Sequence, residues 1–129
     1  MVIDTSAILA ILFNESERRR YNKKIADDTL RLVSAATYLE AAIIIDDRLG
    51  YDGTRDLKLF FAEAELQVES VTLEQAEAAR EAYRKYGRGN HPARLNFGDC
   101  FAYALAKVSK QPLLFKGNDF SQTDIPAVV

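Results

Sequence analysis

Short strand-like segments that alternate with helical ones constrain the fold of this chain more than any other feature. Strands are predicted at residues 1–3, 30–33, 67–71, 112–115 and 127–129. Apolar residues recur at helical spacing at residues 7–13, 15–28, 36–49, 56–66, 73–86 and 97–109, with a break at residues 51–53. This alternation is typical of a parallel sheet covered on both faces. The sequence therefore predicts an α/β sandwich of three layers, with a mostly parallel sheet of four or five short strands between helices.

The length and composition fit an ordinary globular domain. The 129 residues, 48% of them hydrophobic and 28% charged, suffice for a core, and we predict a single domain over residues 1–129. The one cysteine, Cys100, excludes an internal disulfide and a Cys-based zinc cluster and fits a reducing cytosol. No basic signal-peptide region precedes Asp4, and the apolar runs are too short to span a bilayer. We expect a cytoplasmic protein without membrane attachment.

Two acidic residues lie where a parallel sheet places its working site, beyond the carboxyl ends of the strands. Asp4 directly follows the first predicted strand, and Asp119 lies in the loop after the strand at residues 112–115. Each also has a simpler interpretation. Asp4 can cap the helix at residues 7–13, for which Thr5 and Ser6 are good caps as well. Asp119 can be a turn residue only.

Glu40 is more informative, because its neighbours one helical turn away are Ala36, Thr37, Ile43 and Ile44. A carboxylate beside an apolar helix face is rare unless it is paired or binds a ligand. A salt bridge to a Lys or Arg is the alternative. Asp99 lies in the first turn of the helix that Asn96 caps, where an acid also stabilises the helix dipole.

Together these acids predict a divalent-cation site, because hard ions such as Mg²⁺ and Mn²⁺ prefer oxygen ligands. The net charge of −2 means that any contact with nucleic acid is local. A basic stretch runs through Arg80, Arg84, Lys85, Arg88, His91 and Arg94, and Lys116 precedes the last acid. Arg88, Arg94 and Lys116 are the predicted contacts to RNA phosphates. A solvated, charged helix face is the alternative interpretation of these residues.

Four segments also resemble a known family. They are VIDTSA (residues 2–7), SAATYLE (34–40), LNFGDCFAYA (95–104) and LLFKGNDF (113–120). In this order, over nearly the whole chain, they are similar to the PIN-domain ribonucleases and, among these, to the VapC toxins of type II toxin–antitoxin systems.

The resemblance implies a PIN-like fold, an Mg²⁺- or Mn²⁺-dependent endoribonuclease activity, a homodimer and a VapB-type antitoxin that covers or enters the acidic groove. It assigns catalytic roles to Asp4, Glu40, Asp99 and Asp119, the first three as metal ligands with Asp4 and Asp99 as the principal ones. Many relatives carry the fourth acid one or two positions earlier, where this chain has Gly117 and Asn118. Supporting roles fall to Thr5, Ser6 and Asn118.

Two other functions remain open from the sequence. A phosphoacceptor receiver domain also places Asp at strand ends, but it expects an acid pair near the first strand, and Glu40 has no role in it. A non-catalytic binding module with the same fold would not need the acids. A Ser-His-Asp triad has no support, because nothing places His91, the one histidine, near a nucleophile. Glycine-rich nucleotide-binding motifs are absent.

Overall fold

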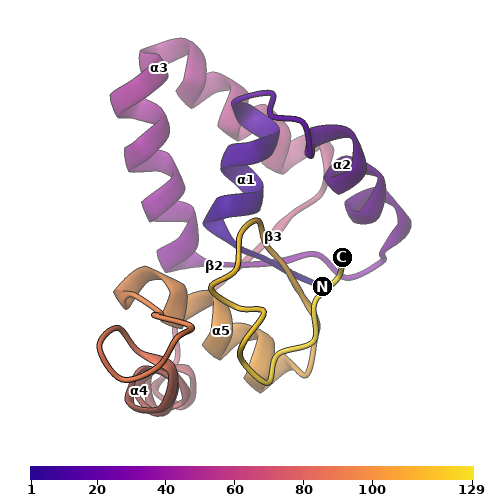
Figure 1. Ribbon diagram of the computed structural model, residues 1–129. Coiled ribbons are helices and arrows are strands. Elements are labelled where there is room, and N and C mark those ends of the chain that lie inside the picture. Colours follow the sequence, from indigo (N-terminus) through magenta and orange to yellow (C-terminus); the bar gives the residue numbers. More distant parts are fainter.

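Four short parallel strands form the centre of the computed structural model, which describes residues 1–129 (Figure 1). They are β1 (Val2–Ile3), β2 (Leu32–Ser34), β3 (Gln67–Glu69) and β4 (Leu113–Leu114), in the order β3-β2-β1-β4. Val2 pairs with Leu32 on one side and Leu113 on the other. The predicted parallel sheet is confirmed, and β1, which ends just before Asp4, lies inside it rather than at an edge.

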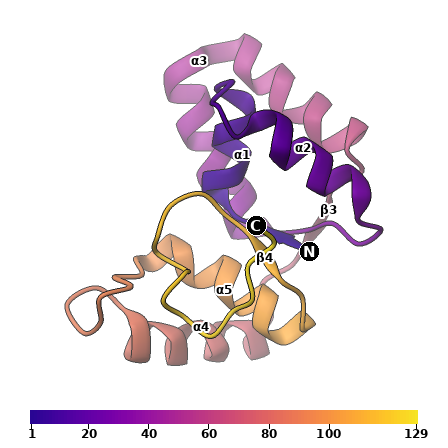
Figure 2. The ribbon, with the colours of Figure 1, turned by 45° about the vertical axis from the view of Figure 1, so that its right-hand side comes forward.

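Helices cover both faces of this sheet (Figures 1 and 2). One face packs on α1 (Thr5–Leu12), α2 (Arg18–Asp27) and α3 (Ala35–Glu63), and the other on α4 (Leu73–Tyr86) and α5 (Phe97–Ser109). Strand side chains alternate between the two cores. Val2, Leu32 and Leu113 belong to the core with α4 and α5, whereas Ile3, Val33 and Leu114 belong to the core with α1, α2 and α3. All six are buried, which explains why these strands are apolar without alternation in the sequence.

The boundaries of α4 and α5 agree with the sequence prediction, the interpretation of Asp4 as a helix cap is confirmed, and two other predictions were wrong. The Asp4 side chain caps α1 by accepting a hydrogen bond from the Ser6 backbone, so neither Thr5 nor Ser6 is the cap. The chain turns within α3 at Gly50 (φ 62°, ψ −146°), not at residues 51–53, since glycine tolerates this positive φ. Residues 127–129 form no strand, and only an isolated bridge joins Ala127 to Leu113.

The topology brings three chain segments together at the end of the sheet where the strands have their carboxyl ends. Asp4 follows β1, α3 starts immediately after β2, and the segment beginning with Phe115 and Lys116 follows β4. Because all strands of a parallel sheet have their carboxyl ends on the same side, residues far apart in the sequence meet there. None of the helices combines the length and the apolar character that crossing a membrane requires.

Candidate metal centre

Asp4 is held at the sheet edge by a serine two residues further along the chain. The backbone N–H of Ser6 donates to Asp4 Oδ2 at 3.0 Å and the Ser6 hydroxyl donates to the same oxygen at 2.7 Å. Ser6 Oγ in turn accepts a hydrogen bond from the Lys116 backbone N–H at 2.9 Å. Ser6 therefore ties Asp4 to the segment after β4, and Asp4 is only 4% exposed.

Glu40 reaches the same edge from α3, whose start is capped by the buried Ser34. The Thr5 hydroxyl donates to Glu40 Oε1 at 2.5 Å. The salt-bridge alternative for Glu40 is wrong, because no Lys or Arg forms an ion pair with it. Its carboxylate instead lies against the first turn of α5, at Gly98. Thr5 and Ser6 thus each orient one acid, as expected of residues that support the site.

Asp99 is fixed by the cap of its own helix. Its backbone N–H donates to Asn96 Oδ1 at 2.8 Å, and its Oδ2 accepts from the Asn96 backbone N–H at 3.0 Å. This capping box confirms Asn96 as the cap of α5 and fixes the Asp99 carboxylate in a half-buried position. The helix-cap interpretation of Asp99 therefore holds alongside a role in a site, since only one carboxylate oxygen is used.

Burial and the charges of neighbouring acids raise the pKa values of Asp4 and Asp99. Burial raises the pKa of Asp4 to about 6, helped by the charge of Glu40, although hydrogen bonds from Ser6 lower it. The pKa of Asp99 rises to about 7, first because of burial and then because of the charges of Asp4, Asp119 and Glu40. Carboxylates from four segments of the chain therefore converge in one region, and none of the four forms a salt bridge.

The residues present fit a hard divalent cation by their chemistry, because all four side chains offer carboxylate oxygens. No three of the His, Cys, Asp and Glu side chains are arranged so that they could hold an ion without moving. Mg²⁺ does not require such a cage, since it keeps several waters and is commonly bound through one or two carboxylates. Mutual repulsion also separates carboxylates that have no cation between them.

Lys116, Asn118 and Asp119 lie in the segment after β4 and differ in their exposure and in their partners. Asp119 and Asn118 are exposed in the segment after β4, and the Asn118 side chain makes no hydrogen bond. Lys116 Nζ is paired with Glu15 at 3.2 Å and Glu17 at 3.3 Å, and these pairs raise its pKa. Its charge is thus already partly neutralised.

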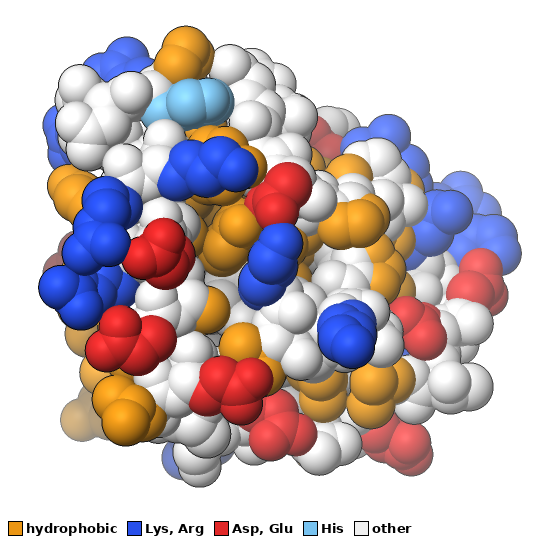
Figure 3. Space-filling model, turned by 90° about the horizontal axis from the view of Figure 1, so that it is seen from below, with side chains coloured by type: hydrophobic (Ala, Val, Ile, Leu, Met, Phe, Trp, Pro, Cys, Tyr) orange, Lys and Arg blue, Asp and Glu red, His pale blue; other side chains and the backbone are white.

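The basic stretch also contains acidic side chains, so it does not form a continuous positively charged patch. Arg80 and Arg84 pair with Glu77 and Glu81 within α4. Figure 3, seen from the side of α4 and α5, shows acidic and basic side chains interspersed. Arg88 and Arg94 are exposed in the loop between these helices, and neither forms a salt bridge.

His91 and Cys100, to which no catalytic role was assigned from the sequence, have structural roles. His91 accepts a hydrogen bond from the Ala93 backbone N–H at 3.0 Å and packs its ring edge-to-face with Tyr86. Cys100 is buried, its thiol donates to the Asn96 carbonyl at 3.3 Å, and burial raises its pKa to about 11. A thiol in this state is a packing group rather than a nucleophile.

One residue of the site, Gly98, belongs to the segment at residues 95–104 but was assigned no role from the sequence. A Cβ at Gly98 would lie only 2.2 Å from Glu40 Oε2, so the absence of a side chain there is part of the geometry. The one signal was a glycine in the second position of a predicted helix, directly before a candidate ligand.

Comparison with known proteins shows the family of the chain. The model of the PIN domain family matches residues 1–126. A protein named Ribonuclease VapC from Mycolicibacterium smegmatis is 54% identical over 99% of both chains. Ribonuclease VapC30 from Mycobacterium tuberculosis is 52% identical over 99% of this chain and 98% of its own.

Solved structures share the fold at low sequence identity. The crystal structure of Mycobacterium tuberculosis VapC20, described as a sarcin–ricin loop cleaving toxin, has a TM-score of 0.77 at 17% identity and covers 96% of this chain and 95% of its own. A toxin–antitoxin complex from Klebsiella pneumoniae contains a chain with a TM-score of 0.70 at 18% identity, with coverage of 95% and 92%.

Proposed function

The chain belongs to the PIN-domain family, and we propose that it is the ribonuclease toxin of a VapBC-type toxin–antitoxin pair. It hydrolyses phosphodiester bonds of RNA as an endoribonuclease. The observation that carries this proposal is the convergence of Asp4, Glu40, Asp99 and Asp119 at the carboxyl ends of the strands, where the charges of the other three raise the pKa of Asp99. Relatives named as VapC ribonucleases, about half identical over the whole chain, support it.

Asp4, Glu40 and Asp99 are the groups that would hold Mg²⁺, for which Mn²⁺ can substitute, with Asp119 beside them. When bound, such an ion neutralises the carboxylates, polarises a phosphate oxygen and lowers the pKa of water. The remaining contribution comes from the chain itself. Ser6 and Thr5 fix the orientation of Asp4 and Glu40, and the Asn96 cap fixes Asp99. Arg88, Arg94 and Lys116 are proposed to contact the phosphate backbone, Lys116 after leaving Glu15 and Glu17.

Incubation with total RNA tests the activity and its metal dependence. We expect endonucleolytic cleavage in Mg²⁺ or Mn²⁺, complete loss with excess chelator, and recovery when either ion is added back in excess. Cleavage that continues in chelator would contradict the metal site. A chain that cuts no RNA in either ion would instead be a non-catalytic binding module with the PIN fold.

An antitoxin of the VapB type is the proposed protein partner, since a structural neighbour was solved as a toxin–antitoxin complex. We propose that its C-terminal segment inhibits cleavage by covering the acidic groove. Co-purification of the chain with the product of an adjacent small gene, and loss of RNA cleavage in the complex, would support this partner.

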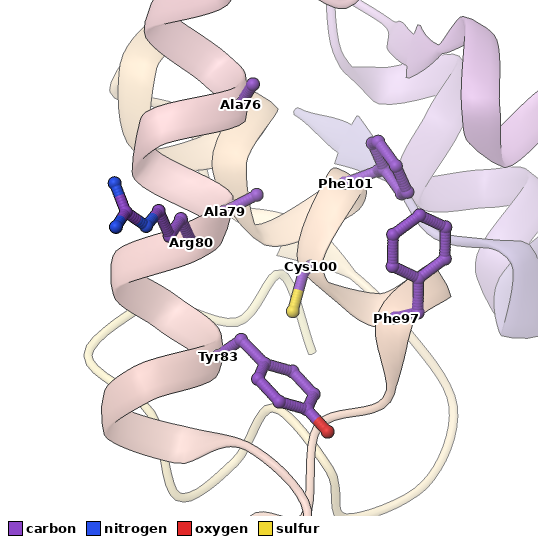
Figure 4. A pocket seen from close by; sticks show the side chains of 7 residues that line it. All are labelled: Ala76, Ala79, Arg80, Tyr83, Phe97, Cys100 and Phe101. Carbon is purple, nitrogen blue, oxygen red and sulfur yellow. The ribbon is translucent and has the colours of Figure 1, made fainter.

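We also propose a homodimer formed through an apolar face at α3 and α5. Leu39, Ile43 and Phe97 are 59%, 58% and 77% exposed, although all three are large and apolar. They border a groove of about 400 Å³ whose lining also includes Ala36, Ile44 and Phe101, and which reaches Glu40 and Gly98 of the acidic site. A cavity of about 230 Å³ between α4 and α5 continues this apolar surface through Phe97 and Phe101, while Arg80 points away from it (Figure 4). Contiguous apolar surface of this kind is typical of protein interfaces.

Ile43→Asp should therefore convert the dimer to a monomer, because a charge at the centre of an apolar interface stays unpaired and desolvated. Size-exclusion chromatography with light scattering measures the mass. Leu73→Asp serves as the control, since Leu73 is 78% exposed at the start of α4 but lines neither cavity. A monomeric parent, or a dimer that persists in Ile43→Asp, would rule out this interface.

A further inference from the structure

We propose that Gly98 is a positioning residue for Glu40: the missing side chain at position 98 determines where the Glu40 carboxylate lies. This inference rests on the proposed function, because it concerns the same acidic site. It adds a residue that carries no ligand atom but decides how close two proposed ligands come to each other.

The Glu40 carboxylate is confined from two sides. On one side the Thr5 hydroxyl donates to Oε1 at 2.5 Å. On the other side the Gly98 backbone lies so close that a Cβ there would be 2.2 Å from Oε2, 3.0 Å from Cδ and 3.2 Å from Oε1. Real contacts at 2.2 Å do not occur between these atoms, so any other residue at position 98 must displace the carboxylate.

The backbone conformation does not explain the glycine. Gly50, Gly89 and Gly117 have positive φ, where glycine is favoured, but Gly98 is not among them. It is the second residue of α5, and glycine in a helix costs more backbone entropy than alanine. A residue that opposes the stability of its own element and is not needed for a turn points to a functional constraint.

The position of Gly98 in the site indicates what this constraint is. Gly98 directly precedes Asp99, which the capping box with Asn96 holds in place. The space at Gly98 lets Glu40 approach the same helical turn and thus sets the separation of the two acids. The N-terminal turn of a helix also carries partial positive charge, which stabilises a carboxylate drawn against it.

Glu40 can leave this place without disturbing the core. Its carboxylate is the end of a flexible side chain and is half-buried. Alanine at position 98 should thus move Glu40 rather than unfold the protein, and it should improve the helix. Stability and metal binding are then expected to change in opposite directions.

Gly98→Ala tests this in the purified full-length protein, with Mn²⁺ binding by calorimetry as the main readout and RNA cleavage as the second. We expect a Tm equal to that of the parent or up to about 4 °C higher. Mn²⁺ affinity should fall by about 10–100-fold, the range typical for residues that orient metal ligands. Cleavage at a fixed, subsaturating Mn²⁺ concentration should fall with it.

Two double variants separate a positioning role from a structural one. In a Glu40→Ala background, Gly98→Ala should cause no further loss of Mn²⁺ affinity, since no carboxylate remains to be displaced. Glu40→Asp shortens the side chain by one methylene, so Gly98→Ala should lower affinity less in that background than in the parent.

Equal Mn²⁺ affinity of Gly98→Ala and the parent would overturn the inference, as would an equal loss in all three backgrounds. A parent that neither binds Mn²⁺ nor cleaves RNA would instead overturn the proposed function. The two failures are therefore distinguishable in one set of measurements.

Discussion

Replacement of Asp4 with Asn is expected to reduce RNA cleavage by more than about 100-fold, since even residues that only support metal ligands cost about 10–100-fold when lost. Asn has the same shape as Asp and keeps an oxygen that can accept the bonds from Ser6. The change therefore removes a charge from the site but leaves the cap of α1 in place. A single-turnover cleavage assay in saturating Mg²⁺ measures the loss.

The metal-free Asp4→Asn variant should be at least as stable as the parent at neutral pH. Asp4 is 4% exposed, and its pKa of about 6 reflects the unfavourable burial of its charge. Asp47→Asn is the matched control, because Asp47 is exposed on α3 and forms no salt bridge. Full cleavage by Asp4→Asn, or an unfolded variant, would refute the role assigned to Asp4.

Raising the pH is expected to destabilise the metal-free protein, and Mg²⁺ is expected to reverse the effect. In the folded state the pKa is about 6 for Asp4 and about 7 for Asp99, both above the ordinary value of 3.8. Between the ordinary and the raised pKa the folded state binds more protons than the unfolded state. The stability that these protons provide is present at low pH and is lost as the pH rises through the folded pKa values.

The expected size of this effect is large for so small a domain. A pKa difference of one corresponds to about 1.4 kcal/mol, so Asp4 alone should lower the free energy of unfolding on the order of 3 kcal/mol by pH 8. A bound cation removes the repulsion, and at 100 times its Kd a ligand stabilises the folded state by about 2.7 kcal/mol. Thermal unfolding at several pH values, with chelator or with Mg²⁺, measures both changes.

Variants show whether the acids cause this dependence. Asp4→Asn combined with Asp99→Asn should flatten the pH dependence between about pH 5 and 8, because both raised pKa values are then absent. It should also abolish the Mg²⁺ effect, because the two principal proposed ligands are lost. Asp47→Asn should retain both. A parent whose stability is constant over this range, with and without Mg²⁺, would show that the acids neither repel one another nor bind the ion.

Most of the secondary structure could be predicted from local patterns. The periodicity of α4 and α5 and the capping signal at Asn96 placed both helices correctly. The apolar character of β1, β2 and β4 indicated strands buried on both faces, and the sheet is indeed parallel. The sequence offered Asp4, Thr5 and Ser6 as caps for α1 and left the choice open, because it depends on side-chain geometry.

The acidic residues Asp4, Glu40, Asp99 and Asp119 could be proposed from the sequence, since each is conspicuous in its own segment: a carboxylate after a strand, on an apolar helix face, in a first helical turn and in a loop. Periodicity and composition are local properties, and they determined the α/β class and these candidates. The tertiary structure alone decided which groups meet. Ser6 forms hydrogen bonds with the Asp4 carboxylate and with the backbone of Lys116, whose side chain pairs with Glu15 and Glu17. The absence of a side chain at Gly98 leaves space for the Glu40 carboxylate. Apart from the neighbouring pair Asp4 and Ser6, these contacts join residues between 58 and 110 positions apart, and only the packing of helices on the sheet brings such residues together.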